Sequence, residues 1–124
     1  MIFLANTSSL IQVVSALAPS GATPTLACYV AYLDTQGQTV NPGDGGTAIA
    51  TATTTTICAS PASGFVRHVK YISVQNANAG PVLVTLQITD GTTLVNLYTK
   101  TAVSLLGGAI FSYHETKWHI SPGW

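Results

Sequence analysis

Apolar and polar residues alternate with a period of two along most of this chain, and this alternation limits its possible folds more than any other feature. Side chains of a β-strand point to opposite faces in turn, whereas those of a helix repeat about every 3.6 residues. The alternation is clearest in Thr25–Leu33 and Val82–Thr89. Their predicted inward sides are Leu26, Cys28, Val30 and Tyr32 in the first segment and Val82, Val84, Leu86 and Ile88 in the second. Residues 48–57 are rich in threonine, whose branched Cβ disfavours helices and suits a strand.

Stretches rich in glycine and proline separate these segments. Asp34–Gly46 contains Pro42 and several glycines, and we expect a long exposed loop there. Residues 60–64 and 76–81 predict turns, and Asp90–Gly91 predicts a hairpin with a two-residue turn. Short strands spaced by about 8–12 residues are typical of a β-sandwich or jelly roll. We therefore predict an all-β fold: a single β-sandwich or jelly roll of about eight short antiparallel strands, with an apolar N-terminal arm.

Phe65–Asn76 is a predicted strand whose apolar residues do not keep one phase. Ile72 and Val74 share a face, but Val66 and Val69 do not share a phase with each other. One extra residue in a strand produces such a shift, so we expect a bulge or twist near Val69–Lys70.

The first 24 residues are apolar but only weakly patterned, with one plausible strand at Leu10–Leu17. We divide the chain into residues 1–24 (arm and first strand), 25–120 (β-sandwich domain) and 121–124 (C-terminal tail). An apolar segment with little local order can become ordered by binding to a neighbouring chain. A terminal tryptophan after proline and glycine is likewise suited to a partner's pocket. The predicted partner-interface residues are therefore Ile2, Phe3, Leu4, Leu10, Ile11 and Trp124.

Charged residues are scarce, and this scarcity excludes several classes of protein. Four Lys+Arg and four Asp+Glu make 6% of the 124 residues, against about 25% in an average soluble domain. Disordered tails need high charge, and nucleic-acid binders need a basic face, so we predict neither. No apolar run is long enough for a membrane span, and Met1–Ala18 lacks the basic start of a signal peptide, which favours a cytosolic start with reduced thiols. An uncharged exterior is poorly soluble alone, so we expect other protein to cover it.

The residues that could carry chemistry do not form a recognised pattern. His114 and His119, with His68 as a third, could hold a metal ion, and Asp34 with Asp44 could form a weak calcium loop, but neither set has the spacing of a known site. Cysteine or serine catalysis is possible in principle, but a buried, inert thiol explains Cys28 better. We predict no enzyme, no catalytic residue, no metal and no cofactor. Whether Cys28 and Cys58 pair stays open.

From Ala48 onward the chain resembles a family of small virion proteins of tailed bacteriophages, and the stretch from Tyr29 to Gly43 is similar to a segment that often precedes it. The residues that carry the resemblance are Thr54–Ile57, Ala59–Gly64, Arg67–Lys70, Ile72–Asn76, Asp90–Thr93, Gly107–Gly108, Tyr113 and Trp118. The resemblance implies a non-enzymatic structural component of the particle.

Together these observations lead to one expectation and one alternative. We expect a capsid decoration (cement) protein of the virion, made in the host cytoplasm, homotrimeric and bound to the major capsid protein. Deleting Met1–Ser9 should then abolish particle binding and leave the β-domain folded. The alternative is a tail, neck or fibre protein that binds host glycans. It predicts an exposed aromatic cluster among Tyr32, Tyr71, Tyr98 and Trp118.

Overall fold

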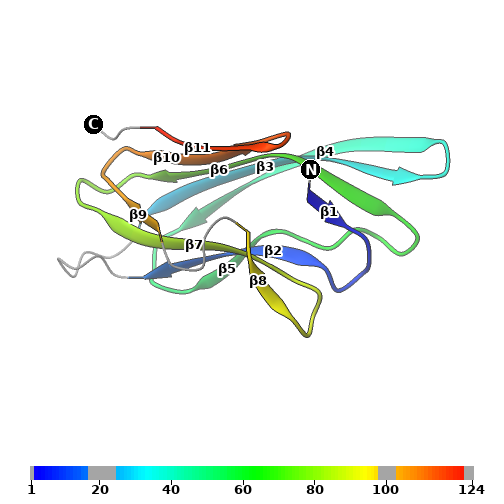
Figure 1. The fold of residues 1–124 in the computed structure, drawn as a ribbon, viewed down its shortest axis with the longest axis horizontal. Coiled ribbons are helices and arrows are strands. Elements are labelled where there is room, and N and C mark those ends of the chain that lie inside the picture. The colour runs from blue at the N-terminus through cyan, green and yellow to red at the C-terminus, as the bar shows by residue number, and fades with distance from the viewer. Residues whose placement is uncertain (1, 17–24, 98–102, 122–124) are drawn as a thin grey trace.

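The computed structural model describes residues 2–16, 25–97 and 103–121 and shows two antiparallel β-sheets packed face to face (Figure 1). The predicted all-β sandwich is confirmed, and the described part of the chain contains more strands than the eight expected. The strands are β1 (Ile2–Leu4), β2 (Leu10–Ala16), β3 (Leu26–Gln36), β4 (Thr39–Ile49), β5 (Thr54–Cys58), β6 (Val66–Asn76), β7 (Val82–Thr89), β8 (Leu94–Asn96), β9 (Val103–Leu105), β10 (Ile110–His114) and β11 (Lys117–Ile120).

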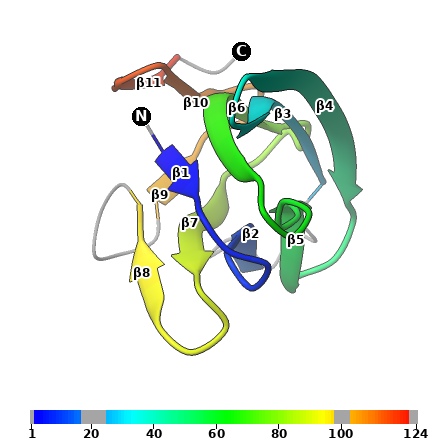
Figure 2. The ribbon, with the colours of Figure 1, turned by 90° about the vertical axis from the view of Figure 1, so that its right-hand side faces the viewer.

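The first sheet has the strand order β11-β10-β6-β3-β4, and β1 also pairs with β6. We call it the six-stranded sheet. The second has the order β5-β2-β7-β8, and β9 also pairs with β7; we call it the five-stranded sheet. In Figure 2 the two sheets are seen from one end, with β1 beside β6 and β2 in the opposite layer.

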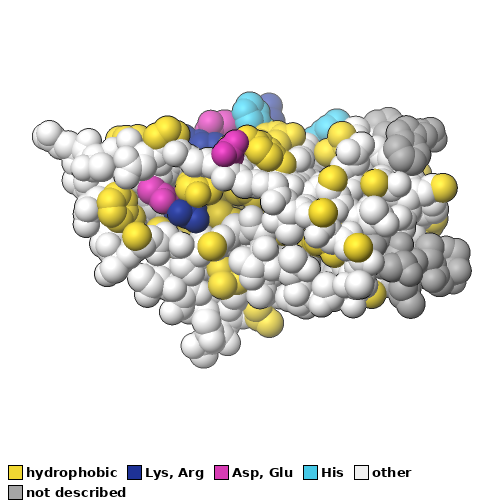
Figure 3. Space-filling view, turned by 180° about the vertical axis from the view of Figure 1, so that it is seen from behind, with side chains coloured by type: hydrophobic (Ala, Val, Ile, Leu, Met, Phe, Trp, Pro, Cys, Tyr) yellow, Lys and Arg dark blue, Asp and Glu magenta, His cyan; other side chains and the backbone are white. Residues whose placement is uncertain are grey.

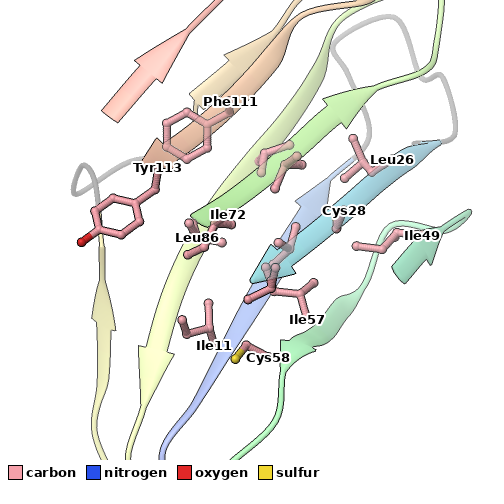
Figure 4. Close-up of a cluster of buried hydrophobic side chains, with 14 of the residues drawn as sticks. Ile11, Leu26, Cys28, Ile49, Ile57, Cys58, Ile72, Leu86, Phe111 and Tyr113 are labelled. Carbon is pink, nitrogen blue, oxygen red and sulfur yellow. The ribbon is translucent and has the colours of Figure 1, made fainter. Parts of the chain in front are cut away.

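The core lies between the two sheets and is built from the inward side of the sequence alternation. Val82, Val84 and Leu86 are buried, as predicted, while Ile88 is partly buried. Side chains from both sheets point into this space in Figure 4, among them Ile11 and Leu86 from the five-stranded sheet and Ile72 from the six-stranded sheet. Apolar surface removed from water by these facing layers is the main stabilising contribution to such a fold.

The stretch predicted as a long loop is instead a long β-hairpin. β3 continues to Gln36 and pairs with β4 along its whole length, so the loop prediction for Asp34–Gly46 is wrong. Gly37, with a φ of 58°, makes the tight turn. Proline and glycine hide the alternation in β4, but β4 is an edge strand, where Pro42 is tolerated. The ring of Tyr32 covers Gly43, where a Cβ would lie 2.6 Å from a ring carbon.

The predicted bulge in β6 is confirmed. Ala31 lies opposite Tyr71 and Tyr32 lies opposite Val69, so Lys70 has no partner of its own in β3. Val69 and Ile72 are both fully buried with two residues between them. The bulge therefore turns both Lys70 and Tyr71 toward the outer face of the six-stranded sheet.

The β7–β8 hairpin forms where Asp90–Gly91 predicted it, but its turn is longer than two residues. β7 ends at Thr89 and β8 begins at Leu94. Oδ1 of Asp90 accepts hydrogen bonds from the backbone N–H groups of Thr92 (2.9 Å) and Thr93 (2.7 Å). These bonds hold the longer turn and lower the pKa of the Asp90 carboxyl group.

Residues 2–16 are part of the sandwich: β2 agrees with the strand predicted at Leu10–Leu17, and the start of the chain before it is paired as well and does not extend as a free arm. β1 pairs with β6, and β2 lies inside the five-stranded sheet between β5 and β7. Leu4 and Ile11 are fully buried in the core of their own chain, which contradicts their predicted role at a partner interface. Residues 17–24 lie outside the described part of the chain. The weak pattern at the start of the chain reflects short β1 and the polar turn after it.

A substitution in β1 tests whether this segment supports the fold. Leu4→Ala should lower the free energy of unfolding by about 2–5 kcal/mol, because it empties a fully buried position. Phe3→Ala is the matched control: Phe3 is 52% exposed on the outer side of the same strand, and its loss should cost less than about 1 kcal/mol. Urea denaturation followed by circular dichroism measures both. Equal stability of Leu4→Ala and the unchanged protein would contradict the placement of β1.

Candidate functional site

Charged side chains are distributed unequally between the two sheets. The charged residues of the described ranges that belong to strands or turns of the six-stranded sheet are Asp34, Asp44, Arg67, Lys70, Glu115 and Lys117. The described strands of the five-stranded sheet carry none, and Asp90 lies in a turn beside them. Figure 3 shows most of the charged and histidine side chains of this face along the top of the view, over the six-stranded sheet, with one acidic and one basic group lower down. The functional groups of the described chain are therefore concentrated on one side.

The bulge in β6 and the turn between β10 and β11 place two of these charges side by side. Glu115 has a φ of 60°, in the left-handed region, and its backbone N–H donates to the carbonyl of Lys70 (2.9 Å). The Tyr113 hydroxyl donates to the Glu115 carbonyl and holds the same turn from the core side. As a result, Nζ of Lys70 lies 3.9 Å from Oε2 of Glu115. This pair is half-exposed and adds little to stability, but it fixes two polar groups at one place on the surface.

A row of aromatic rings lies beside this pair on the outer face. The Tyr29 hydroxyl donates to Oδ2 of Asp44 (2.9 Å), which raises the pKa of the Tyr29 hydroxyl. The ring centroids of Tyr29 and Tyr71 are 6.1 Å apart, and those of Tyr71 and His114 are 6.2 Å apart. The Tyr29 ring is therefore held by Asp44 and Tyr71 while it stays 40% exposed.

A surface hollow of about 500 Å³ lies between these groups. Its lining comes from the β3–β4 hairpin, the β6 bulge and the β10–β11 turn: Tyr29, Ala31, Tyr32, Leu33, Pro42, Gly43, Asp44, Lys70 and Glu115. Carboxylates, an ammonium group and aromatic rings can accept or donate hydrogen bonds and stack against a ligand. No serine, threonine or cysteine is among these described lining residues, so the arrangement is suited to binding and offers no nucleophile of those types.

Asp34 and Arg67 form a buried ion pair at the end of the sandwich. Asp34 accepts two hydrogen bonds from Arg67, at Oδ1 (2.7 Å) and Oδ2 (2.8 Å). Nη1 of Arg67 also donates to the Ala59 carbonyl, and its guanidinium lies 3.7 Å from the Tyr32 ring centroid. Asp34 is thus occupied by Arg67, Asp44 binds Tyr29, and the calcium loop proposed for this pair has no structural support. Sequence reasoning missed the ion pair, because it assigned Asp34 to a loop, whereas β3 continues through Asp34 and pairs there with Arg67 of β6.

The three histidines lie on different elements of the six-stranded sheet. His68 contacts Thr35 through Nε2 (2.8 Å) and the ring of Phe3, whereas His114 lies beside Tyr71 and His119 is exposed on β11. No group of three or more metal-ligating side chains comes together within the described ranges. In the same ranges, no helix has the length and apolar character that a membrane crossing requires.

The aromatic residues predicted to form one exposed cluster do not do so. Tyr32 packs against the core beneath Arg67, and Trp118 stacks on Phe111 (5.2 Å between centroids), while Tyr98 lies outside the described residues. Tyr71 alone joins the outer aromatic row. The alternation could have identified its neighbour Tyr29 as a residue of the outer face, because Tyr29 has the opposite phase to the buried Cys28 and Val30.

The remaining predicted interface residues are only partly available. Ile2 packs against the core, Phe3 is 52% exposed, and Leu10 lies half-buried on the outer face of the five-stranded sheet. Trp124 lies outside the described residues. No family model, no curated protein and no solved structure matches this chain.

Both cysteines are buried and unpaired, in β3 and in β5. Burial raises the pKa of the Cys28 thiol from 9.0 to about 12. Burial also raises the pKa of Cys58, although the nearby Arg67 opposes the shift. Neither thiol has the lowered pKa of a nucleophile.

The Asp34–Arg67 pair leads to a stability prediction. Asp34→Ala should lower the free energy of unfolding by about 3 kcal/mol, because it leaves the largely buried Arg67 guanidinium without its counter-ion. Asp44→Ala removes an exposed carboxylate of the same hairpin and should cost less than about 1 kcal/mol. Urea denaturation at neutral pH compares the two. A similar loss in both variants would show that the Arg67 pair has no special role.

The raised pKa of Cys28 leads to a prediction for alkaline solutions. In the unfolded chain the thiol ionises near its ordinary pKa of 9.0, whereas in the folded chain it stays protonated until about pH 12. This contribution to stability is therefore complete below about pH 9 and is lost as the pH rises toward 12. Cys28→Val should lose less stability than the unchanged protein between about pH 8 and about pH 10.5 in urea denaturation. Parallel losses would contradict it.

Proposed function

We propose that this protein is a non-enzymatic structural component of a bacteriophage particle, a capsid decoration (cement) protein that self-associates and binds the lattice of the major capsid protein. The observation that carries the proposal is the outer face of the five-stranded sheet, which has no charged side chain among its described strands. Low charge also characterises the whole chain, with equal numbers of acidic and basic residues. The proposal combines this face with the resemblance to phage virion proteins.

The outer face of the five-stranded sheet is uncharged but not uniformly apolar. Residues directly opposite in antiparallel strands share a face, so the pairing defines rows across the sheet. These rows are Thr56–Gln12–Gln87–Asn96, Thr54–Val14–Thr85, Leu10–Thr89–Leu94 and Ala16–Leu83–Ser104. Gln87 donates to Gln12 within the first row (3.0 Å). Threonine, glutamine and aliphatic side chains can be buried against another protein without the cost of desolvating a charge.

The unequal distribution of charge supports an orientation on the particle. We place the five-stranded sheet against neighbouring protein and the six-stranded sheet, with its charges and histidines, toward solvent. Closed symmetric oligomers such as trimers are a common way for small identical subunits to cover shared surfaces. The core positions of Leu4 and Ile11 move the proposed contact away from the start of the chain, so deletion of Met1–Ser9 is expected to harm folding as well as binding.

A tail, neck or fibre location is the alternative, and the number of copies per particle separates it from the capsid. If this chain decorates the head, a stained gel of purified virions, calibrated on the band of the major capsid protein, should show hundreds of copies per particle. A number of copies close to that of a known tail or neck protein would contradict decoration of the capsid. Analytical ultracentrifugation of the free protein tests self-association: a monomer at high concentration would contradict the proposed trimer.

A pair of matched substitutions tests the proposed docking face. Gln87→Lys puts a charge on the outer face of the five-stranded sheet, and Gln75→Lys puts the same charge on the outer face of the six-stranded sheet; both glutamines are half-buried in the interior of their sheets. Gln87→Lys should reduce cosedimentation with undecorated capsids at least about tenfold, because a buried, unpaired charge is costly at an interface. Gln75→Lys should bind normally. Equal binding of both variants would contradict the docking face.

A further inference from the structure

We propose that the hollow on the outer face of the six-stranded sheet, between Tyr29, Asp44, Lys70 and Glu115, binds a neutral saccharide. This inference goes beyond the proposed structural function and depends on different residues. The hollow has a volume of about 500 Å³, within the range of about 300–1,000 Å³ that is common for sites that bind small organic ligands.

The hollow stays open above β3 because the residue there, Ala31, has a small side chain. Ala31 lies in the middle of the outer row of β3, between Tyr29 and Leu33. Its neighbour on β6 is Tyr71 and its neighbour on β4 is Asp44. A large side chain at position 31 would fill the space that Tyr29, Leu33 and Asp44 surround.

One wall presents an aromatic ring in a fixed position. The hydroxyl of Tyr29 is held by Asp44 at 2.9 Å and its ring lies against Tyr71, so little conformational freedom is left to lose on binding. The ring is nevertheless 40% exposed. Leu33 and Pro42 extend the apolar surface beside it. A ligand with an apolar face can therefore pack against this wall.

The rim of the hollow offers hydrogen-bond groups that are positioned but not fully used. Oδ2 of Asp44 binds Tyr29 and Oε2 of Glu115 faces Lys70, while the Lys70 and Glu115 side chains are 31% and 50% exposed. Each carboxylate has a second oxygen and further lone pairs, and the ammonium group has three N–H donors. A ligand with several hydroxyl groups can bind both acceptors and donors of this rim.

Charge selects among the ligands that could meet these conditions. Two carboxylates and one ammonium group give the rim a net negative charge, which disfavours phosphates and other anions. The apolar wall disfavours a simple hydrated ion. A sugar ring is neutral, carries hydroxyl groups around its edge and has an apolar C–H face that packs on aromatic rings. A neutral saccharide therefore fits the wall, the rim and the charge together.

The site is compatible with the proposed docking of the five-stranded sheet, because it lies on the opposite layer of the sandwich (Figure 2). A copy attached to a particle through that sheet would still present the hollow to solvent. Failure of saccharide binding would leave the docking proposal intact, and failure of docking would leave saccharide binding intact.

Titration of the full-length protein with glucose, galactose, N-acetylglucosamine and maltose, followed by two-dimensional NMR, tests the proposal. At least one of these sugars should cause saturable shifts at Tyr29, Ala31 and Lys70, with a Kd of about 1 mM, which is typical of so small a ligand in an open site. Ala31→Trp should weaken the affinity at least about tenfold by filling the hollow. Ala27→Trp is the matched control, since Ala27 lies on the same face of β3 but outside the hollow, and its affinity should change less than about twofold.

Several results would overturn this assignment. Absence of saturable shifts with all four sugars at about 20 mM would do so, since this exceeds the expected Kd severalfold. Equal loss of binding in the Ala27 and Ala31 variants, in proteins with unchanged circular dichroism, would place the ligand elsewhere. Shifts at the hollow caused by a lysine tripeptide but not by any sugar would assign the site to a cationic peptide and reject the saccharide.

Discussion

The antiparallel pairing of β3 with β6 is the interaction on which the six-stranded sheet depends. It runs from Leu26 and Asn76 to Thr35 and Val66, and it leaves the outer edge of β3 for β4 and the outer edge of β6 for β10 and β1. Cys28 and Val30 of β3 and Val69, Ile72 and Val74 of β6 all stay on the core side, because the extra residue Lys70 absorbs the one change of phase. The same bulge turns Lys70 toward solvent, so the feature that preserves the core also helps to form the outer hollow.

Much of this architecture could be predicted from the sequence, since alternation reports which face of a strand is buried. It identified β7, the inward residues of β3 and the bulge beside Val69. The alternation gave no information where a strand is rich in glycine and proline or is too short to show a period. Glycine and Pro42 hide the pattern of edge strand β4, so the hollow that β4 helps to line could not be anticipated. The Asp34–Arg67 pair could not be anticipated either, because the last residues of β3, which pair with β6 there, show no apolar alternation. β1 is too short to show a period, so the core position of Leu4 becomes visible only through its pairing with β6.

The two layers of the sandwich differ in what they can do. The five-stranded sheet offers an outer face of threonine, glutamine and aliphatic side chains, suited to contact with other protein over its width. The six-stranded sheet carries the ion pairs, the histidines and the aromatic row, which are suited to contact with small polar molecules. Under the two proposals, assembly belongs to one layer and ligand recognition to the other. In this arrangement the two functions can change independently, because the core between the layers isolates the residues of each.

The composition of β4 has a consequence for the dense packing of copies that the proposed function requires. An unpaired sheet edge is a template on which a strand of another chain can grow, and the risk increases when many neutral copies stand close together. In β4 that edge contains Pro42, which has no backbone N–H to donate, and glycines, which weaken the pairing of a strand. The exposed edge of β4 is thus a poor template for amyloid-like stacking, so neighbouring copies that met at this edge would not readily join their sheets there.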